Sequence, residues 1–311
     1  MNDYVAVIGA ANIDIGGQPF CPLVYKDSNR GEMSIGFGGV ARNIAHNLCL
    51  LGVPVKMFSS VGGDALGRDL LKNCRDLGMD VENVLVNEDA ISSMYIYIND
   101  VQGDMALAIS HVKLDDVLTP EYFAERMDII NNAKIVLVDC NISAAAFEYL
   151  AKHCTAPMFV DPVSQDQSAK IGKNLGLIDT LKPNGLEAEY LTGMTIETIA
   201  DAEAAAKALL ETGIKRVFLS MDKDGMLAAD KDHMELVPSC VKDLVCTTGA
   251  GDSTMAAIIW SIFNDNKDIV DATKAANAAA ALTIGVVETI NPDMSEEALR
   301  NMIETNYRNG V

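Results

Sequence analysis

A short stretch, Thr247–Ser253, combines two glycines, a small residue and one carboxylate directly before an apolar helical run over 254–263. The preceding segment, 234–246, has the character of a strand and a loop, so the glycines should lie at the start of a helix. Unpaired backbone N–H groups and the positive end of the helix dipole favour a phosphate there. The carboxylate, Asp252, can accept the proton of a hydroxyl that attacks this phosphate. The alternative is a glycine-rich loop whose Asp only stabilises its own helix.

Further polar residues follow predicted strands. The apolar run 5–8 predicts a buried strand, and Asn12 and Asp14 come just past its carboxyl end. Asp139 and Asp161 follow two later apolar runs in the same way. Because ligands bind at the carboxyl ends of the strands in open α/β sheets, we expect these side chains on the ligand side of the sheet.

Helical and strand-like segments alternate through the middle of the chain. The expected order is helix 121–130, strand 135–138, helix 144–153 and strand 158–160. This alternation predicts an α/β fold with a mostly parallel central sheet covered on both faces. Hydrophobic residues make up 49% of the 311 residues, which is ample for a sizeable core.

Charge and composition limit the partners. A formal net charge of −20 argues against nonspecific binding to nucleic acid or to an anionic membrane surface. The N-terminal residues Met1–Asp3 are not basic, and the apolar run after them is too short for a signal peptide or a membrane span. These N-terminal features predict a cytoplasmic protein. The seven cysteines are scattered without a CxxC pair, so we expect small core residues or reduced thiols and no structural zinc.

A dinucleotide-binding oxidoreductase is one alternative, because Gly36–Ala41 fits the loose pattern G-x-G-x-x-A. That fold needs an acidic residue for the ribose at the end of the next strand. The next predicted strand, 55–58, is followed by Ser59 and Ser60, with no carboxylate before Asp64. The pattern therefore counts against a dehydrogenase.

Two motifs resemble the signatures of the ribokinase-like (PfkB) carbohydrate and nucleoside kinases. Thr248–Asp252 is similar to their C-terminal signature and Gly38–Ala45 to their N-terminal one, in the right order and at roughly the family's separation. The resemblance extends over essentially the whole chain. The segments Asp27–Gly39 and Asn43–Asn47 further resemble the pseudouridine kinase branch.

The resemblance implies a ribokinase-like three-layer sandwich, with a single kinase domain over 1–311. A small β-sheet lid formed by about 16–35 and 92–111 would close over the sugar and, as in many members, make a homodimer contact. Residues 16–35 mix Gly, Pro and polar positions with short apolar pieces, which suits extended strands better than a helix.

The implied activity is ATP-dependent transfer of the γ-phosphoryl group to a sugar or nucleoside hydroxyl, first of all the 5′-hydroxyl of pseudouridine. Ribokinase or another sugar kinase of the family, or a non-catalytic sugar or nucleotide sensor, is the alternative. In the catalytic role we expect Asp252 as the base and the backbone N–H groups of Gly249, Ala250 and Gly251. The residues expected at the acceptor are Asn12, Asp14, Asn29, Gly38, Gly39 and Asn43. Those expected at the nucleotide are Asn184, Ser220, Gly225, Thr248 and Asn277.

The segment Leu181–Glu187 resembles the family's N-x-x-E element. Asn184 and Glu187 lie one helical turn apart and could hold Mg²⁺ through its waters, with ATP as co-substrate. The same pair fits a capping box at a helix start, and both roles are geometrically compatible.

The chain departs from the family pattern at two places. Asp222 replaces the usual first glycine of the loop at the nucleotide, which puts the fine geometry near the ATP phosphates in doubt. Cys246 stands where potassium-binding members carry a carboxylate. A neutral thiol is a poor ligand for a hard cation, so we expect weak or absent activation by a monovalent cation.

Overall fold

The computed structural model describes residues 3–114, 116–242, 244–265 and 268–307, so Met1 and Asn2 of the N-terminal segment lie outside them. Within these residues, eight strands form the main sheet in the order β14-β13-β12-β11-β10-β9-β1-β4. Strand β13 pairs antiparallel with both β12 and β14, and all other neighbours pair in parallel, which confirms the predicted mostly parallel sheet. The strands are β1 (Val5–Ile8), β4 (Val55–Phe58), β9 (Ile135–Asp139), β10 (Met158–Asp161), β11 (Thr180–Leu181), β12 (Arg216–Ser220), β13 (Met226–Asp230) and β14 (Met234–Val237).

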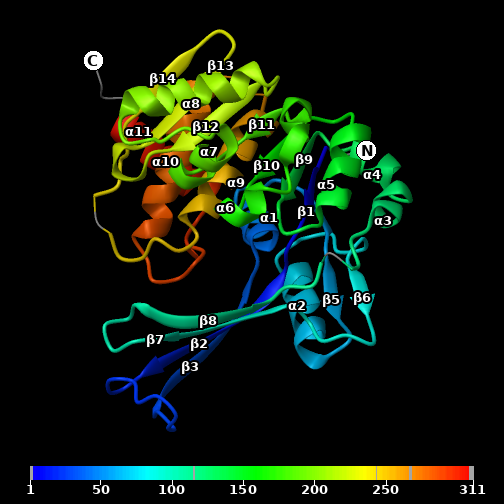
Figure 1. Cartoon of the computed structure of the whole chain (residues 1–311), viewed down its shortest axis with the longest axis vertical. Helices are drawn as coiled ribbons and strands as arrows, with labels where there is room; N and C mark the ends of the chain where they lie inside the picture. Colours follow the sequence, from blue (N-terminus) through cyan, green and yellow to red (C-terminus); the bar gives the residue numbers. More distant parts are fainter. Residues whose placement is uncertain (1–2, 115, 243, 266–267, 308–311) are drawn as a thin grey trace.

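Helices cover both faces of the main sheet (Figure 1). Within the described residues, no helix is both long and apolar enough to cross a membrane. The helices are α1 (Val40–Leu50), α2 (Ala65–Asp76), α3 (Pro120–Ala124), α4 (Met127–Asn131), α5 (Ala144–His153), α6 (Gln165–Ser168), α7 (Gly185–Thr192), α8 (Ile199–Glu211), α9 (Ala250–Phe263), α10 (Ile269–Ile284) and α11 (Glu296–Tyr307), with 3-10 turns η1 (Gly172–Leu177) and η2 (Asp222–Asp224).

Alternating strand residues divide the core into two layers. In β1, Val5 and Val7 face a cluster that includes buried residues of α1, α2, α9 and α10. Ala6 and Ile8 face the opposite cluster, with α3, α5 and α8. Because successive side chains of a strand point to opposite faces, one apolar run feeds both layers. All four residues are fully buried, so the short run at 5–8 lies at the centre of the molecule.

The helix predicted over 121–130 is wrong as a single element, because α3 and α4 are separate short helices. The chain leaves helical geometry at Arg126, with φ of −118° and ψ of 4°. There the Arg126 guanidinium lies 4.2 Å from the centre of the Tyr122 ring and Nη1 donates to the Tyr122 carbonyl. These contacts with a residue four positions earlier place Arg126 back over the preceding turn, and apolar periodicity does not reveal them.

A separate four-stranded sheet projects from the main body at the lower left of Figure 1. Its order is β3-β2-β7-β8, with β2 (Asn12–Pro19), β3 (Gly31–Gly38), β7 (Met94–Asn99) and β8 (Met105–His111). The parallel pairing of β2 with β7 joins the two chain segments that were expected to form a small sheet. A further pair, β5 (Ser60–Gly62) and β6 (Leu85–Asn87), lies beside α2.

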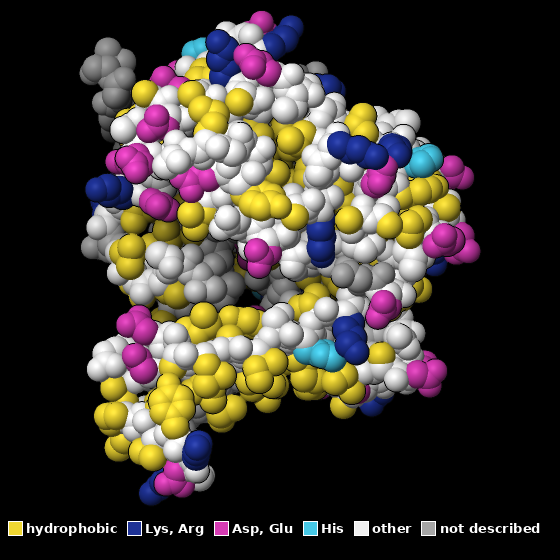
Figure 2. Space-filling view, in the orientation of Figure 1, with side chains coloured by type: hydrophobic (Ala, Val, Ile, Leu, Met, Phe, Trp, Pro, Cys, Tyr) yellow, Lys and Arg dark blue, Asp and Glu magenta, His cyan; other side chains and the backbone are white. Residues whose placement is uncertain are grey.

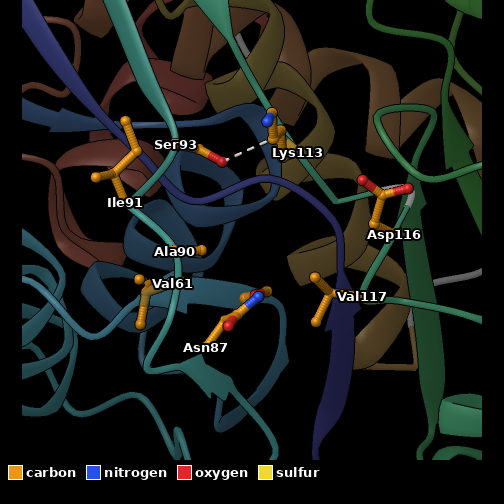
Figure 3. A pocket seen from close by; sticks show the side chains of 10 residues that line it. Val61, Asn87, Ala90, Ile91, Ser93, Lys113, Asp116 and Val117 are labelled. Carbon is orange, nitrogen blue, oxygen red and sulfur yellow. Dashed lines mark hydrogen bonds between the residues drawn. The ribbon is translucent and has the colours of Figure 1, made fainter.

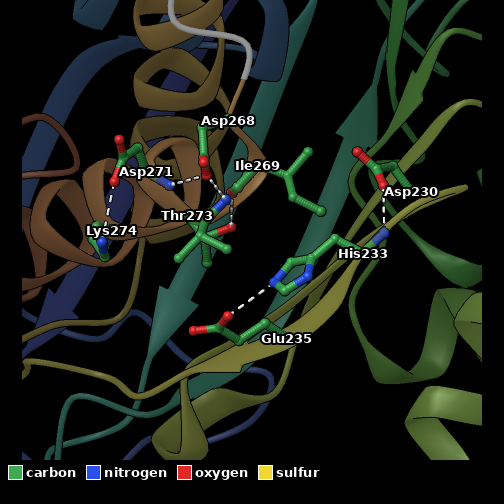
Figure 4. Close-up of polar contacts among 9 residues, drawn as sticks. Asp230, His233, Glu235, Asp268, Ile269, Asp271, Thr273 and Lys274 are labelled. Carbon is green, nitrogen blue, oxygen red and sulfur yellow. Dashed lines mark hydrogen bonds and ion pairs between the residues drawn. The ribbon is translucent and has the colours of Figure 1, made fainter.

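The edge of the main sheet at β14 carries a tight turn, shown with the start of α10 in Figure 4. Asp230 Oδ1 accepts from the His233 N–H at 2.8 Å, and His233 Nε2 lies 2.9 Å from Glu235 Oε2. Asp268 accepts from two backbone N–H groups in the first turn of α10. These carboxylates close a turn and cap a helix, which are structural roles.

Asp139, at the end of β9, ties three elements together at the carboxyl edge of the sheet. Its Oδ2 accepts from the N–H groups of Ala10 at 2.9 Å and Ala41 at 2.8 Å, and Oδ1 accepts from Asn141 at 2.9 Å. The side chain is fully buried, and burial raises the pKa of its carboxyl. Asp139 therefore does not offer a free carboxylate to a ligand, but it holds the start of α1 against β1.

Replacing Asp139 with Asn should destabilise the fold. An amide has only one acceptor oxygen, so at least one of the three N–H donors would face an NH₂ group, at a cost of about 1–3 kcal/mol. Urea unfolding followed by circular dichroism measures the change, with the exposed Asp89→Asn as the control. An unchanged unfolding midpoint for Asp139→Asn would contradict this role.

Candidate active site

Helix α9 begins at the glycine-rich stretch, as predicted. Gly249 precedes it in a left-handed conformation with φ of 83°. A Cβ atom at this position would collide with the Thr289 carbonyl oxygen, so the close approach requires glycine. Asp252 lies in the first turn of the helix. The carboxylate is thus beside the N-terminal N–H groups of α9, where an anion is favoured.

The residues around these N–H groups differ in their bonding. The N–H of Ala250 donates to the Thr247 carbonyl at 3.3 Å, a long hydrogen bond that closes the loop before the helix. The N–H of Gly251 lies in the first turn, where a helix provides no partner of its own. Thr248 is exposed on the loop. The N–H of Gly251 is therefore better placed than the N–H of Ala250 to donate to a bound phosphoryl group.

Asp252 is bonded to a residue of the N-terminal motif. Asn43 Nδ2 donates to Asp252 Oδ2 at 2.9 Å. Burial, with a smaller contribution from Asp161, raises the pKa of Asp252 to about 7, against the opposing effects of the Asn43 hydrogen bond and Lys182. A carboxyl group with a pKa near the working pH suits a general base. The two signature motifs thus meet at one carboxylate.

The predicted acceptor residues of the small sheet also lie together. Asn12 and Asp14 are both on β2, and Asn12 Nδ2 donates to Asp14 Oδ1 at 2.5 Å. Gly38 pairs with Asn12 across the sheet, and a Cβ atom on Gly38 would overlap the Asp14 carboxyl group. Burial raises the pKa of Asp14 to about 6, opposed by Arg42 and Asn12. Gly39 follows and precedes α1, where its carbonyl accepts from the Asn43 N–H.

Two of the predicted nucleotide residues are neighbours. Ser220, at the end of β12, pairs with Asn184 in an isolated bridge, and the Ser220 N–H donates to the Pro183 carbonyl at 3.0 Å. Gly225 follows the η2 turn and returns the chain to β13. Asn184 and Ser220 therefore lie side by side at the carboxyl edge of the main sheet.

Asp222 has a backbone conformation that glycine favours. Its φ is 47°, in the left-handed region that glycine favours and that Asp tolerates better than most residues. The Gly225 N–H donates to the Asp222 carbonyl at 3.3 Å, and the Met221 N–H donates to the Gly225 carbonyl at 2.8 Å. The loop is thus a closed turn with a left-handed residue at this position.

Two other predicted side chains are engaged in local structure. On α10, Asn277 Nδ2 donates to the carbonyls of Val237 at 3.0 Å and Pro238 at 3.1 Å, so it fixes the segment after β14. Asn29 Oδ1 accepts from the Val24 N–H, and its Nδ2 donates to the carbonyls of Val24 and Asp27. The amide of Asn29 closes its own exposed loop, and among the described residues no hydrogen bond joins this amide to Asp252 or Asn43.

Asn184 and Glu187 form the capping box that was one reading of their spacing. The Asn184 N–H donates to Glu187 Oε2 at 2.8 Å, and the Glu187 N–H donates to Asn184 Oδ1 at 2.9 Å. Glu187 is only 3% exposed. Burial and then Asp161 raise the pKa of its carboxyl to about 7, opposed by Lys182.

The donor set near Glu187 fits magnesium only in part. Carboxylate oxygens are the ligands that Mg²⁺ prefers, and the cap uses one oxygen of Glu187. Within the described residues, no group of three His, Cys, Asp or Glu side chains is arranged to hold a metal ion alone. A magnesium ion here would take its other ligands from water and from phosphate oxygens, as it commonly does.

Lys182, which directly follows β11, is a candidate that the sequence analysis did not single out. It is 4% exposed, and its Nζ lies 3.3 Å from Asp161 Oδ2. The same Nζ would lie 3.7 Å from a Cβ atom on Gly251. A buried ammonium group beside the start of α9 can meet a phosphoryl oxygen. The sequence feature that could have identified Lys182 is its position just past a short apolar strand, two residues before Asn184.

The molecular surface is hollowed between the small sheet and the main body (Figure 2). A smaller cavity of about 190 Å³ lies at the base of the small sheet, between β5, β6 and the flanks of β7 and β8 (Figure 3). There the Lys113 N–H donates to Ser93 Oγ at 3.3 Å, and Asp116 and Asn87 also line the space. None of the predicted site residues lines this cavity.

Comparison with known proteins agrees with this geometry. Pseudouridine kinase of Escherichia coli is 35% identical over 304 residues, covering 97% of both chains. Guanosine-inosine kinase of Exiguobacterium acetylicum is 28% identical over 301 residues, covering 93% of this chain and 97% of the relative. Among solved structures, ribokinase of Thermotoga maritima has a TM-score of 0.85 at 22% identity, covering 97% of this chain and 100% of that one.

Residues 2–297 match the family described as pfkB family carbohydrate kinase. This match spans both signature motifs, all three sheets of the described residues and most of their helices. The match accounts for two features of the site. Asp252 lies at a glycine-rich helix start, and Asn43 of the N-terminal motif donates a hydrogen bond to it. The chain therefore belongs to the PfkB family of carbohydrate kinases and is an ATP-dependent carbohydrate or nucleoside kinase of ribokinase-like fold.

Proposed function

We propose that this kinase transfers the γ-phosphoryl group of ATP to the 5′-hydroxyl of pseudouridine. The observation that carries the proposal is the placement of Asp252 in the first turn of α9, where Asn43 Nδ2 donates to its carboxylate. Asp252 accepts the proton of the attacking hydroxyl as this oxygen forms its bond to the γ-phosphorus. The bond from that phosphorus to the bridging oxygen of ADP breaks at the same time.

The chain supplies binding and electrostatics around this step. Asp14 accepts hydrogen bonds from two ribose hydroxyls, and Asn12 holds its carboxylate in place. The N–H of Gly251 and the ammonium of Lys182 stabilise charge on the transferring phosphoryl group. When bound, Mg²⁺ neutralises phosphate charge, with Glu187 holding it directly or through water.

The choice of acceptor rests on similarity and on the chemistry of the nucleobase. The Escherichia coli relative is named for pseudouridine, whereas the Exiguobacterium relative is named for guanosine and inosine. A C-linked uracil presents one ring N–H more than uridine does. A site that bonds this N–H leaves its own acceptor unpaired when uridine binds. Ribose or another sugar of the family's range is the alternative acceptor.

The small sheet supports a second proposal, that it pairs with the same sheet of a second copy. One face carries apolar side chains that are 39 to 68% exposed: Met33, Ile35, Ile96, Met105, Leu107 and Ile109. Ile15 pairs with both Ile35 and Ile96, so these residues share one face, while Asp14 points to the other. Such a contiguous apolar face in the lid, visible along its lower side in Figure 2, fits a self-complementary dimer contact.

The base assignment predicts a loss of turnover in Asp252→Asn. The substitution keeps the size and polarity of the side chain but removes proton acceptance, so kcat should fall by roughly 10²-fold or more. The KM for the acceptor should change little. Steady-state assays of ADP release measure both, with Asp271→Asn in the first turn of α10 as the matched control. Near-normal kcat in Asp252→Asn would show that Asp252 only caps its helix.

The acceptor assignment predicts that pseudouridine has the highest kcat/KM in a screen that includes uridine, inosine, ribose and fructose phosphates. One unpaired buried group costs about 1–3 kcal/mol, so the preference over uridine should be roughly tenfold to a hundredfold. The preference over free ribose should be larger. A best kcat/KM for ribose or for a fructose phosphate would reject pseudouridine and leave the kinase assignment in place.

The dimer proposal predicts a change of mass on charging the apolar face. In Ile35→Lys/Ile109→Lys, like charges in the contact should convert a dimer to a monomer at micromolar concentration. Light scattering after size exclusion measures the mass. Ile199→Lys, on the surface of α8, serves as a control that also exposes a new charge. A wild-type chain that is monomeric, or a double variant that stays dimeric, would contradict the proposal.

A further inference from the structure

Arg42 is a buried cation that links three elements around the active site. Its guanidinium Nη1 donates to the Phe37 carbonyl at 2.8 Å and to Asn43 Oδ1 at 3.2 Å, and Nη2 donates to Asn73 Oδ1 at 2.8 Å. Phe37 lies near the end of β3, Asn43 on α1 and Asn73 on α2. The residue is only 4% exposed.

The bond to Asn43 decides which way the Asn43 amide faces. A guanidinium has donors only, so the atom that meets Nη1 must be the amide oxygen. Asn43 Nδ2 is thereby turned toward Asp252 Oδ2, at 2.9 Å. If the amide were reversed, two oxygens would face each other at Asp252 and two donors at Arg42. The guanidinium therefore specifies the orientation in which Asn43 donates to Asp252.

Packing alone does not account for the burial of Arg42. Within the described residues its buried Nε has no hydrogen-bond partner. A buried charge with an unpaired donor costs free energy that a well-packed apolar side chain would not. The contacts that it does make reach Asn43, the end of the small sheet at Phe37, and Asn73 of α2.

We propose that Arg42 is a positioning residue, which acts on phosphoryl transfer by holding the Asn43 amide so that Nδ2 bonds Asp252. This inference rests on the proposed role of Asp252 as the base. It adds a residue of the N-terminal motif that touches neither substrate. Because the same Nη1 bonds the Phe37 carbonyl, Arg42 also joins the end of β3 to the Asn43 side chain.

The contacts run from Arg42 through Asn43 to Asp252, and other charged groups lie near Asp252 and near Arg42. Around Asp252 they are Asp161 and Asp139, which raise its pKa, and Lys182, which lowers it. Within the part of the chain that the structure describes, none of these three side chains forms a hydrogen bond or an ion pair with Arg42. Their effects on the pKa of Asp252 are therefore the same in the wild type and in an Arg42 variant. A change of this pKa on replacing Arg42 is not due to them.

Three titratable groups surround the guanidinium itself. Burial lowers the pKa of Arg42, whereas Cys74 and Asp14 raise it. Burial and the charge of Arg42 lower the pKa of His46 to about 4, so His46 is neutral at the pH of an assay. Asp14 affects the design of the test, because loss of the Arg42 charge raises the pKa of Asp14. Turnover measured with both substrates saturating limits this second effect, because the acceptor then occupies Asp14.

The test is the pH profile of kcat in Arg42→Met. The released Asn43 amide can turn its oxygen to Asp252, which favours the protonated carboxyl. The base must be deprotonated to act, so kcat falls as the pH drops through the pKa of Asp252. A higher pKa therefore moves the acidic limb of the kcat profile to higher pH. We expect an upward shift of about one pH unit, a tenfold change in the protonation equilibrium. At pH above the limb, kcat should return to within a few-fold of wild type.

A double variant separates positioning from charge. If Arg42 acts through Asn43, then Arg42→Met should shift the limb no further in an Asn43→Ala background. A direct effect of the lost charge would persist in that background. Arg75→Met, an exposed position on α2, controls for removal of a positive charge and should leave the limb unchanged.

Several outcomes would overturn the proposal. One is an equal loss of kcat at every pH, and another is a limb shift that survives in the Asn43→Ala background. If Arg42→Met does not fold, Asn73→Ala removes the partner of Nη2 and should shift the limb upward by less; an unmoved limb there also rejects the proposal. Near-normal turnover in Asp252→Asn would instead reject Asp252 as the base, and this result is independent of Arg42.

Discussion

The hydrogen bond from Asn43 Nδ2 to Asp252 Oδ2 joins side chains that are 209 residues apart in the chain. It brings the start of α1 to the start of α9, an N-terminal helix end that favours phosphate. Both helices pack on the same face of the main sheet, in one core cluster. The separation of the two motifs in space is therefore set by helix packing rather than by any loop.

Several buried charges lie within this small region, and each is balanced by a specific partner. Asp139 accepts three backbone N–H groups, Asp161 pairs with Lys182, and Arg42 uses both terminal nitrogens as donors. Unbalanced charges at such burial would be costly. Among the described residues, the side-chain donor to Asp252 is Asn43. Burial raises the pKa of the Asp252 carboxyl to about 7 against the effect of this bond, so the group has capacity to take a proton.

The small sheet presents two chemically different faces. Asp14 and Asn12 lie where the sheet meets the main body, whereas the other face carries the exposed isoleucines and methionines. Strand alternation produces both from the same short segments. A lid that binds a polar ligand on one side and packs on a second copy on the other is consistent with these faces, and Arg42 connects its end to the catalytic region through Phe37.

Sequence patterns alone predicted much of the site. The glycines of Thr247–Ser253, the Asp at a helix start and the polar residues after strand 5–8 follow from local backbone rules, and the structure has them at those elements. The alternation of helices and apolar strands predicted the mostly parallel sheet. Asn184 and Glu187 form the local capping box that their spacing indicated.

Only the tertiary structure decided how individual polar side chains are used. Asp139 looked like a ligand residue, but neighbouring N–H groups saturate it, and the amides of Asn277 and Asn29 bond nearby backbone. Lys182 and Arg42 became candidates through burial and long-range contacts. Local sequence rules describe backbone conformation and which face of an element is apolar. The partner of a buried polar atom depends on which distant elements pack together, and no local pattern contains that information.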